Sequence, residues 1–408
     1  MAHRYVKINN FHSEFLNCAA TVVESVPSSA NQTLDGPQIP DKSLIRLSII
    51  DSLDDLRARK IEWKKLLEMS PTNTIFQTFE WISSCWKVFN SNSKLFLILI
   101  EKADRIVGIA PLAIRRKKFL GIKQRVVEFI GSGLSDYLDF IYSSEVPDIL
   151  LMMLDCLSKN RHRWDIAQLT NIPNDSITLS ILPTFLDSNG YLSDIRIMCE
   201  AFSYIFGNPE LDKNVVKKKS LKRHHNYFVR NGNLEFINLK VQKDILCHID
   251  GFFEQHIKRR SVTEHKSQFI DTRHREFFRE LVGAFARTDF LLFSVLLFNK
   301  VPLAFHFGFE YEKKIIWYKP AFNIDFYKKS PGQVMLKYLF EYGMDRKVSE
   351  FDFTIGSEPF KLRFSNRARS LYTVNVFQKR MTYVYNRALR NLKDILKRSI
   401  IFTYMRRK

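Results

Sequence analysis

The sequence contains no apolar run long enough to form a membrane-spanning helix, which needs about 20 residues. The longest obvious run, LFLILI, covers only residues 95–100. The first residues, MAHRYVKINNFHSEF, carry charges and histidines where a secretory signal has an apolar core. The five cysteines lie far apart and form no C-x-x-C pair, a pattern typical of reduced thiols. We therefore expect a protein that stays in the cytoplasm.

Glycine and proline are also scarce, with 14 Gly and 13 Pro among 408 residues, whereas Phe occurs 35 times. This composition argues against disorder over most of the chain and favours dense packing. Hydrophobic residues make up 45% of the chain, and a single core seldom grows beyond about 250 residues. The length and composition therefore predict two globular domains.

Acidic residues are outnumbered, because 43 Asp and Glu face 63 Lys and Arg, for a net charge of +20. This excess implies an anionic partner, such as a nucleic acid, a lipid surface or a phosphorylated substrate. Residues 376–408 contain ten basic residues and one acid, and so supply +9 of that charge. Their leucines recur at helical spacing, which predicts a basic helix that either lies on an anionic membrane surface or packs on the protein body.

Several catalytic signatures are absent from the sequence. It has no nucleophile elbow, no GxxxxGK[ST] phosphate loop and no catalytic Cys/His arrangement, which disfavours hydrolases and nucleotidases. His256, His265 and His274 are nine residues apart, a spacing that neither one helix face nor a compact zinc loop uses. We expect no bound metal.

The order of the predicted elements is that of a mixed α/β protein. A strand near residues 44–50 precedes a helix over 51–69, with Asp51 or Ser52 as its N-cap. The segment LFLILIEKADRIVGIAPLAIRRK, residues 95–117, predicts two strands joined by a short polar turn. The second half repeats this plan, since LLFNKVPLAFHF, residues 296–307, has the pattern of the earlier hairpin.

The repeated plan predicts two α/β units of the same design joined by a basic segment. The expected parts are a flexible leader over 1–42, an N-terminal domain over 43–200, a basic connecting helix and strand over 201–240, a C-terminal domain over 241–375, and a basic helix or tail over 376–408.

The segment AFNIDFYKKSPGQVMLKYLFEYG, residues 321–343, contains the clearest chemical motif. Ser330 is the predicted N-cap of a helix and Pro331 its first residue. Free N–H groups at such a start, beside Lys328 and Lys329, can bind a pyrophosphate, and Gly332 allows it to approach closely. An ordinary capped helix is the alternative.

Two other segments carry chemistry. FDFTIGSEPFKLRF, residues 351–364, puts carboxylates beside a strand end, where one can act as a general base or simply pair with Lys361. KNVVKKKSLKRHHNYFVRNGN, residues 213–233, predicts one basic helix that is either solvated or binds an anion.

Six segments taken together resemble one family: FQTFEWISSCW, RIVGIAPL, FIGSGLSDYLDF, KKKSLKRHHN, SPGQVML and FDFTIGSEPFKLRF. They follow the order found in the CelD-like acetyltransferases of the GNAT superfamily, which are similar in plan to the Fem peptidyltransferases. The resemblance spans roughly residues 44–375.

This resemblance implies two tandem GNAT-like domains in a bacterial protein, cytoplasmic or peripheral at the inner membrane. It implies transfer of an acetyl or other short acyl group from acyl-CoA to an amine or hydroxyl of a sugar or exopolysaccharide precursor. In such enzymes the strand before the main helix splays from its neighbour, and the pyrophosphate lies at the helix start. These features correspond here to residues 315–322 and 330–333. Because the first half has no counterpart of SPGQ, we expect one donor site.

The sequence departs from the family at one catalytic motif. The usual E-x-Y-K becomes Glu358 to Lys361 with Phe360 at the tyrosine position, so the hydroxyl that would protonate a leaving thiolate is missing. We predict Asp136 and Glu358 as candidate bases, with Asp352 behind them. The predicted donor-binding residues are Phe322, Lys328, Lys329, Ser330, Pro331, Gly332 and Gln333, and the predicted acceptor-binding residues are Gly133, Ser135, Tyr137, Gly356 and Lys361.

Two rival functions remain open. A Fem-like transferase would use aminoacyl-tRNA and would need the basic segment over 213–230, whereas no nucleic acid partner is expected otherwise. A catalytically degenerate GNAT pair would act as a scaffold in a membrane-associated polysaccharide complex, as the missing hydroxyl at Phe360 and the basic tail suggest.

Overall fold

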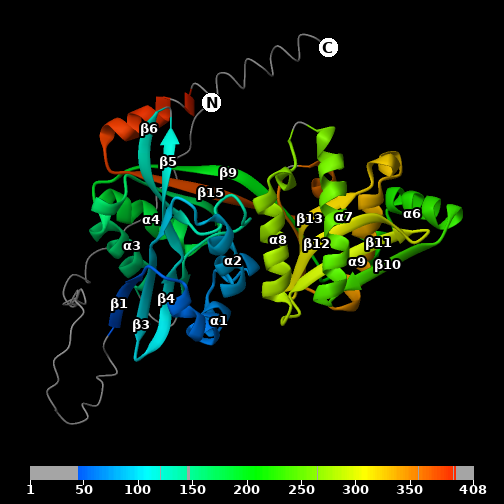
Figure 1. The fold of residues 1–408 in the computed structure, drawn as a ribbon, viewed down its shortest axis with the longest axis horizontal. Helices are drawn as coiled ribbons and strands as arrows, with labels where there is room; N and C mark the ends of the chain where they lie inside the picture. The colour runs from blue at the N-terminus through cyan, green and yellow to red at the C-terminus, as the bar shows by residue number, and fades with distance from the viewer. Residues whose placement is uncertain are drawn as a thin grey trace. The chain divides into compact units, whose positions relative to one another are not determined.

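The computed structural model describes residues 45–119, 121–144, 148–263, 265–356, 358–388 and 390–391. The predicted leader, 1–42, and most of the predicted tail lie outside these residues. Within them the protein is a mixed α/β fold with a four-stranded and an eleven-stranded sheet (Figure 1). The predicted fold class is therefore confirmed.

The four-stranded sheet has the order β1-β3-β4-β7, and the eleven-stranded sheet has the order β10-β11-β12-β13-β14-β9-β15-β8-β6-β5-β2. In the described residues the strands are β1 (Ile45–Ile50), β2 (Ser93–Leu95), β3 (Leu97–Lys102), β4 (Arg105–Ala110), β5 (Leu112–Phe119), β6 (Ile122–Phe129), β7 (Ile141–Tyr142), β8 (Ile166–Pro173), β9 (Leu192–Ile205), β10 (Leu234–Leu239), β11 (Leu291–Phe298), β12 (Val301–Tyr311), β13 (Lys314–Phe322), β14 (Glu350–Ile355) and β15 (Arg367–Phe377). The helices are α1 (Lys60–Met69), α2 (Phe79–Phe89), α3 (Ile149–Lys159), α4 (Ile177–Ser188), α5 (Pro209–Val216), α6 (Lys219–Asn231), α7 (Gln242–Ser261), α8 (Thr272–Phe285), α9 (Pro331–Asp345) and α10 (Pro359–Phe364).

The repeated plan is present in the backbone. In the first half β6 and β8 are parallel neighbours with α3 between them in sequence, and in the second half β13 and β14 are parallel neighbours separated by α9. The β3–β4 hairpin turns through Ala103 and Asp104, and the β11–β12 hairpin through Asn299 and Lys300, all with positive φ. Two consecutive residues of this kind form the tight turn that suits the twist of antiparallel strands. The two hairpins therefore share their turn geometry as well as their sequence pattern.

Alternating apolar residues give the second half a core on each face of its sheet. On one face Phe293, Val295 and Phe305 pack against α7 and α8. On the other face Leu292 and Leu296 pack against α6 and α9. Successive side chains of a strand point to opposite faces, so each strand contributes to both cores. Figure 1 shows helices on both sides of β11–β13.

One aromatic cluster is shared by the two halves. Trp81 on α2 makes edge contacts with Phe277 on α8 and Phe309 on β12, with ring centroids 5.4 and 5.8 Å apart. At the rim, Lys87 pairs with Glu280 at 2.7 Å. Aromatic edge contacts of this kind add about 0.5–1.5 kcal/mol each beyond burial. The first half is therefore packed directly onto the helices of the second.

Several local predictions were wrong. Neither Asp51 nor Ser52 caps a helix, because a short 3-10 helix, Asp54–Arg59, precedes α1. Residues 95–117 belong to more than the expected two strands, since Pro111 separates β4 from β5. The basic segment 213–233 is not one helix, because the chain is non-helical between the end of α5 and the start of α6. Like charges close together on a helix destabilise it, and α5 and α6 each pack against α9.

Strands β9 and β15 were not predicted, and they connect the two halves. They are antiparallel neighbours in the middle of the larger sheet; β9 also pairs with β14, and β15 also pairs with β8. The predicted domain boundary at residue 200 lies inside β9.

The described start of the basic tail packs on the protein body. Tyr383 contacts Phe377 with ring centroids 5.5 Å apart, and Arg390 forms an ion pair with Asp194. Among the residues that the structure describes, no helix is both long and apolar enough to cross a membrane.

Candidate active site

Strands β13 and β14 separate along their length. They pair in parallel at three positions, Lys314 with Glu350, Ile315 with Phe351 and Ile316 with Asp352, and the pairing ends there. Beyond Ile316, β13 continues to Phe322 and remains paired with β12, and β14 remains paired with β9 on its other edge. From residue 317 onwards, the edge of β13 that faces β14 therefore has no strand partner among the described residues. This is the splay expected for residues 315–322.

Thr354 lies at the point of separation in a strained conformation. Its φ is +59°, which is rare for any residue but glycine and a clear outlier for a β-branched one. Its N–H donates to Asp352 Oδ1 at 2.7 Å, and its hydroxyl lies 3.4 Å from the carbonyl of Trp317 on the opposite strand. Strain of this kind costs about 1–3 kcal/mol and is concentrated at functional sites.

The loop GSGLSDYLDF of the first half reaches the point where β13 and β14 separate. Tyr137 donates its hydroxyl hydrogen to Asp352 Oδ1 at 2.8 Å, and Tyr318 on β13 donates to the carbonyl of Leu134 at 2.7 Å. Ser135 accepts a hydrogen bond from the indole of Trp81 at 2.8 Å. Gly131 has a φ of +93°, and a Cβ there would lie 2.4 Å from the Ser135 hydroxyl. The loop is therefore tied to both halves and needs its first glycine.

Asp136 is the residue that this loop places deepest in the charged part of the site. Its side chain is only 3% exposed. Burial raises the pKa of its carboxyl, while the charges of Lys319 and Lys361 and a hydrogen bond from Thr354 act in the opposite direction. Burial that raises the pKa of a carboxyl also makes its carboxylate a stronger base, which suits a general base.

Glu358 and Lys361 form a compact ion pair against the end of β14. Lys361 is 4% exposed, and its ammonium donates to the carbonyl of Ile355 at 2.5 Å and lies 3.2 Å from Glu358 Oε2. Burial acts to raise the pKa of Glu358, but the charge of Lys361 and neighbouring donors outweigh it and bring the pKa below its ordinary value. Gly356 has a φ of +129°, and a Cβ on it would lie 2.4 Å from Glu358 Oε2. Glycine is thus required for this pair to form.

Asp352 is the third predicted carboxylate, and it is 4% exposed. Burial, assisted by the charge of Glu350, raises its pKa to about 6, despite the hydrogen bonds from Thr354 and Tyr137. Asp352 accepts one hydrogen bond from Tyr137 of the loop and another from the N–H of the strained Thr354. Its contacts therefore indicate a role in holding Tyr137 and Thr354 in place.

The raised pKa of Asp352 predicts a pH dependence of stability. A carboxyl whose folded pKa lies above its unfolded value of about 3.9 destabilises the folded state increasingly as the pH rises from about 4 to about 6. Two pKa units correspond to roughly 3 kcal/mol at pH 7. We expect Asp352→Asn to remove this loss of folding stability, because Asn cannot ionise but keeps an oxygen that accepts both hydrogen bonds. Urea unfolding between pH 4 and 7 measures it. The exposed Asp175, replaced by Asn, is the control, and parallel pH profiles for wild type and Asp352→Asn would contradict the assignment.

Lys319 belongs to the site, although it was not among the predicted residues. It lies on the free part of β13, where burial lowers the pKa of its ammonium and Asp136 partly restores it. Arg259 on α7 lies over the ring of Phe322, 5.2 Å from its centroid, and burial lowers its pKa to about 10. In the described residues, neither Lys319 nor Arg259 has an ion pair. A lysine inside the otherwise apolar strand IIWYKPAF was the available signal.

The predicted pyrophosphate loop lies where β13 leads into α9. Ser330 is at the N-cap position and Pro331 is the first helical residue, as predicted, but Ser330 has a φ of +49° and its side chain makes no capping hydrogen bond. The N–H of Gly332 bonds to none of the described residues, and a Cβ on Gly332 would lie 3.2 Å from the ring of Phe322. Gln333 accepts from Arg363 at 2.7 Å through its side chain. The helix start therefore presents a free donor beside the end of the splayed strand.

Cations surround this helix start. Lys328 and Lys329 are exposed, and the ammonium of Lys329 lies over the ring of Tyr227 on α6, 4.2 Å from its centroid. On the same side, Lys218 donates to the carbonyl of Arg363. The basic segment before α6 and the predicted phosphate loop are thus neighbours in space.

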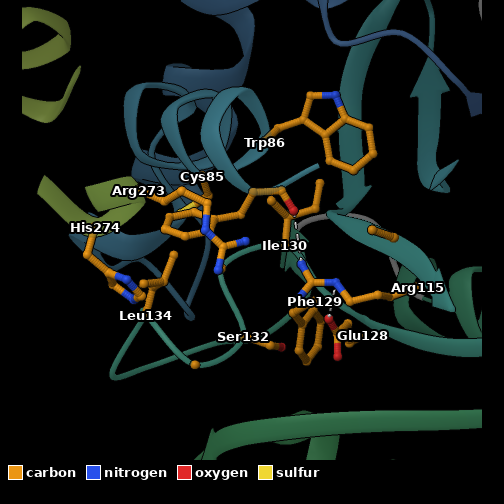
Figure 2. Close-up of a pocket in the computed structure, with 14 residues that line it drawn as sticks. Cys85, Trp86, Arg115, Glu128, Phe129, Ile130, Ser132, Leu134, Arg273 and His274 are labelled. Carbon is orange, nitrogen blue, oxygen red and sulfur yellow. Dashed lines mark hydrogen bonds and ion pairs between the residues drawn. The ribbon is translucent and has the colours of Figure 1, made fainter. Parts of the chain in front are cut away.

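A cavity of about 290 Å³ lies beside the glycine turn (Figure 2). It is lined from α2 by Cys85, Trp86 and Phe89, and from the other half by Arg273 and His274 on α8. Gly133 is in its wall, together with Gly131, Ser132 and Leu134, and Figure 2 shows Arg115 of β5 paired with Glu128 of β6 at its edge. Ser135, Asp136 and Tyr137 do not line it, because Ser135 is buried against Trp81 and the turn carries Asp136 and Tyr137 to the splay.

The structure therefore brings one group of predicted residues together at the splay: Asp136, Tyr137, Asp352, Gly356, Glu358 and Lys361. The second group, Phe322 and residues 328–333, lies at the end of β13 and the start of α9. Gly133 lines the separate cavity, and Ser135 is buried against Trp81.

A splayed pair of parallel strands followed by a helix with a free N-terminal donor defines an acyltransferase fold of the GNAT type. Residues 216–362 match the family described as "Acetyltransferase (GNAT) domain". The match to this family thus lies within the second half and includes β13, α9 and β14. No curated protein sequence matches the chain significantly.

Solved structures share the fold of the chain. The crystal structure of FemX is similar with a TM-score of 0.56 and 9% identity, over 77% of this chain and 95% of that one. A conserved protein of unknown function from Bacteroides thetaiotaomicron is similar with a TM-score of 0.53 and 10% identity, over 82% of this chain and 100% of that one. At such identities the likeness concerns the fold alone.

Proposed function

We propose that the protein transfers an acetyl or other short acyl group from acyl-CoA to an amine or hydroxyl of a sugar or cell-envelope precursor. The observation that carries this proposal is the position of Asp136, a buried carboxyl beside the point where β13 and β14 separate, near Lys319 and Lys361. The CelD-like resemblance supports the exopolysaccharide context.

The donor would bind along the second half. The free N–H of Gly332, the dipole of α9 and the exposed Lys328 and Lys329 suit a pyrophosphate. The open edge of β13 beyond Ile316 suits the amide groups of the pantetheine arm. When bound, acyl-CoA supplies a thioester carbonyl as the electrophile. No counterpart of this helix start was found in the sequence of the first half, so we propose one donor site.

The chain's own residues would move the protons. Asp136 takes the proton from the acceptor amine or hydroxyl as its nitrogen or oxygen bonds to the thioester carbon. The carbon–sulfur bond then breaks, and Lys319 gives a proton to the departing sulfur. Asp136 finally returns its proton to Lys319. Burial lowers the pKa of Lys319, which suits it to replace the family tyrosine. Phe360, at the tyrosine position, packs on Phe353 with centroids 6.1 Å apart.

Calorimetry with acetyl-CoA tests the donor assignment. We expect saturable binding at roughly micromolar affinity, about 8 kcal/mol. Release of free thiol in the presence of amino sugars would then report turnover. A titration that gives no heat with any short acyl-CoA would overturn the proposal.

A Fem-like transfer from aminoacyl-tRNA is the second candidate. The fold likeness to FemX and the position of the basic α6 beside α9 favour it. It predicts tRNA binding whose affinity falls steeply with salt concentration. Binding of tRNA in competition with acetyl-CoA would support this candidate over the first.

We also propose that the protein acts in the cytoplasm, peripherally at an anionic membrane surface. The positive charge of residues 376–408 supports this membrane location. The same charge supports a role as a scaffold if the protein has no acyl-transfer activity. Deleting the residues after Val376 is expected to abolish binding to anionic vesicles while coenzyme binding persists. Equal vesicle binding by the shortened chain would contradict it.

A further inference from the structure

A second cavity, of about 480 Å³, lies at the edge of the larger sheet in the first half. Residues from β2, β5 and β6 and from the turn before β8 line it, and none of them is acidic. They are Asn92, Ser93, Lys94, Ile114, Arg116, Arg125, His162 and Arg163. None of these was predicted as a site residue, and none belongs to the splay or to the start of α9.

The strand register concentrates positive charge here. Arg116 on β5 lies directly opposite Arg125 on β6, and Lys118 lies opposite Lys123. Residues directly opposite in an antiparallel pair share a face of the sheet, and like charges in such pairs destabilise the sheet. The pair of Arg116 and Arg125 therefore destabilises the sheet unless negative charge lies nearby, and the pair of Lys118 and Lys123 repeats the pattern outside the cavity.

Counter-charges inside the protein are few. Arg125 pairs with Asp165 at 2.9 Å, a bond that also anchors it beside the cavity. Among the described residues no ion pair involves Lys94, Arg116 or Arg163. The cavity thus contains three cations without a carboxylate partner in that part of the chain.

Two of the arginines are held in position before any ligand arrives. The guanidinium of Arg163 lies over the ring of the buried Phe96, 4.8 Å from its centroid. Arg125 donates to the carbonyl of His162 at 2.7 Å and to both oxygens of Asp165. Lys94 and Arg116 are exposed and free to close on a ligand. Arginines fixed in this way bind phosphate oxygens well, because their planar donor groups match them.

We propose that this cavity binds a ligand through its phosphate group or groups. The volume is within the range of small-molecule pockets, about 300–1,000 Å³. The phosphate belongs either to a free small molecule or to a lipid headgroup. The site is in the half of the chain that lacks the proposed donor loop, and the inference does not depend on acyl transfer.

The test uses the full chain and inorganic pyrophosphate as the probe. Pyrophosphate is titrated by calorimetry at low salt into the wild type and the variants, all of which keep the proposed donor site unchanged. We expect the double variant Lys94→Gln and Arg116→Gln to bind pyrophosphate at least about tenfold more weakly than the wild type. Arg105→Gln, which removes an exposed cation from β4 in the other sheet, is the matched control and should bind as the wild type does.

A second arm identifies the source of the phosphate. The same three proteins are sedimented with vesicles that contain phosphatidylglycerol. If only the double variant loses vesicle binding, and pyrophosphate binding does not change, the phosphate belongs to a lipid headgroup. If the double variant loses pyrophosphate binding, the phosphate belongs to a free ligand. The proposal is overturned if the wild type binds neither probe, or if the double variant binds as tightly as the wild type. If the protein bound no coenzyme A, the proposed donor site would be contradicted. The comparison of the wild type with its two variants would remain valid, because all three proteins have the same residues at the start of α9.

Stability without ligand gives an independent readout. Because Arg116 faces Arg125 across the strands, Arg116→Gln should raise the thermal unfolding midpoint at low salt, whereas Arg105→Gln should not. A lower midpoint for Arg116→Gln would mean that Arg116 stabilises the sheet by itself, and it would overturn the argument from repulsion.

Discussion

Replacing Asp136 by Asn is expected to lower the rate of acyl transfer by about 10²–10⁴-fold, the range that a positioned general base contributes. The substitution keeps the size of the side chain, and Asn still has an oxygen that accepts the hydrogen bond from Thr354. It loses the ability to take a proton. Binding of acetyl-CoA should therefore persist while turnover falls, and steady-state kinetics should show the loss in kcat.

Asp139, three residues further along the same loop, is the matched control. It is equally buried, but its oxygens accept hydrogen bonds from Thr178, Ser176 and the N–H of Phe140, all within the first half. Asp139→Asn is expected to change stability and to leave the turnover of the folded enzyme unaltered. If Asp136→Asn bound acetyl-CoA and turned over at the wild-type rate, Asp136 would not be the base.

A pH profile separates a catalytic role of Asp136 from a structural one. With a base whose pKa is raised by burial, kcat should fall as the pH drops through that pKa and the carboxylate is protonated. In Asp136→Asn the residual rate should lose this acidic limb. A purely structural residue would lower the rate at every pH and leave the shape of the profile intact.

Replacing Gly332 by Leu is expected to weaken acetyl-CoA binding by about tenfold or more, equivalent to about 1.4 kcal/mol. Gly332 is in the first turn of α9, where its N–H is free and the ring of Phe322 is already 3.2 Å from the position of a Cβ. A side chain there must displace either Phe322 or the phosphate. Calorimetry of the variant measures the effect.

Gly283 provides the matched control for this substitution. It lies in α8, and the nearest atom to a Cβ there, Gln242 Nε2, is 3.7 Å away, an ordinary contact. Gly283→Leu should therefore bind acetyl-CoA as the wild type does. Unchanged binding by Gly332→Leu, with its helix content intact by circular dichroism, would remove the phosphate from this helix start.

Local features of the fold were predictable because they depend on neighbours in sequence. The hairpin between β11 and β12, the helix that begins at Pro331 and the strand β14 all follow from apolar alternation, turn residues and proline position. The side chain of Ser330 was not predictable in the same way. Its left-handed conformation arises where the chain leaves a short 3-10 helix, and it turns the hydroxyl away from a capping role.

Long-range pairing was not predictable from these patterns. Strands β9 and β15 have neighbours that lie far away in sequence, and most residues of β9 are exposed or half-buried, so its apolar pattern is weak. The position of Lys319 in the site was also not predictable from the local sequence. Nothing in its immediate neighbours indicates that Asp136, 183 residues earlier in the chain, would meet it at the splay.

The sequence by itself determined the class of fold, the repeated α/β plan and the types of residue available to the site, because periodicity and turn chemistry act over a few residues. Only the tertiary structure decided which of those residues meet. The splay of β13 from β14, the strained Thr354 and the burial of Asp136 near two lysines arise from contacts between segments that are separated in the sequence. The register of β5 against β6 likewise placed Arg116 opposite Arg125, since pairing partners are set by the whole sheet.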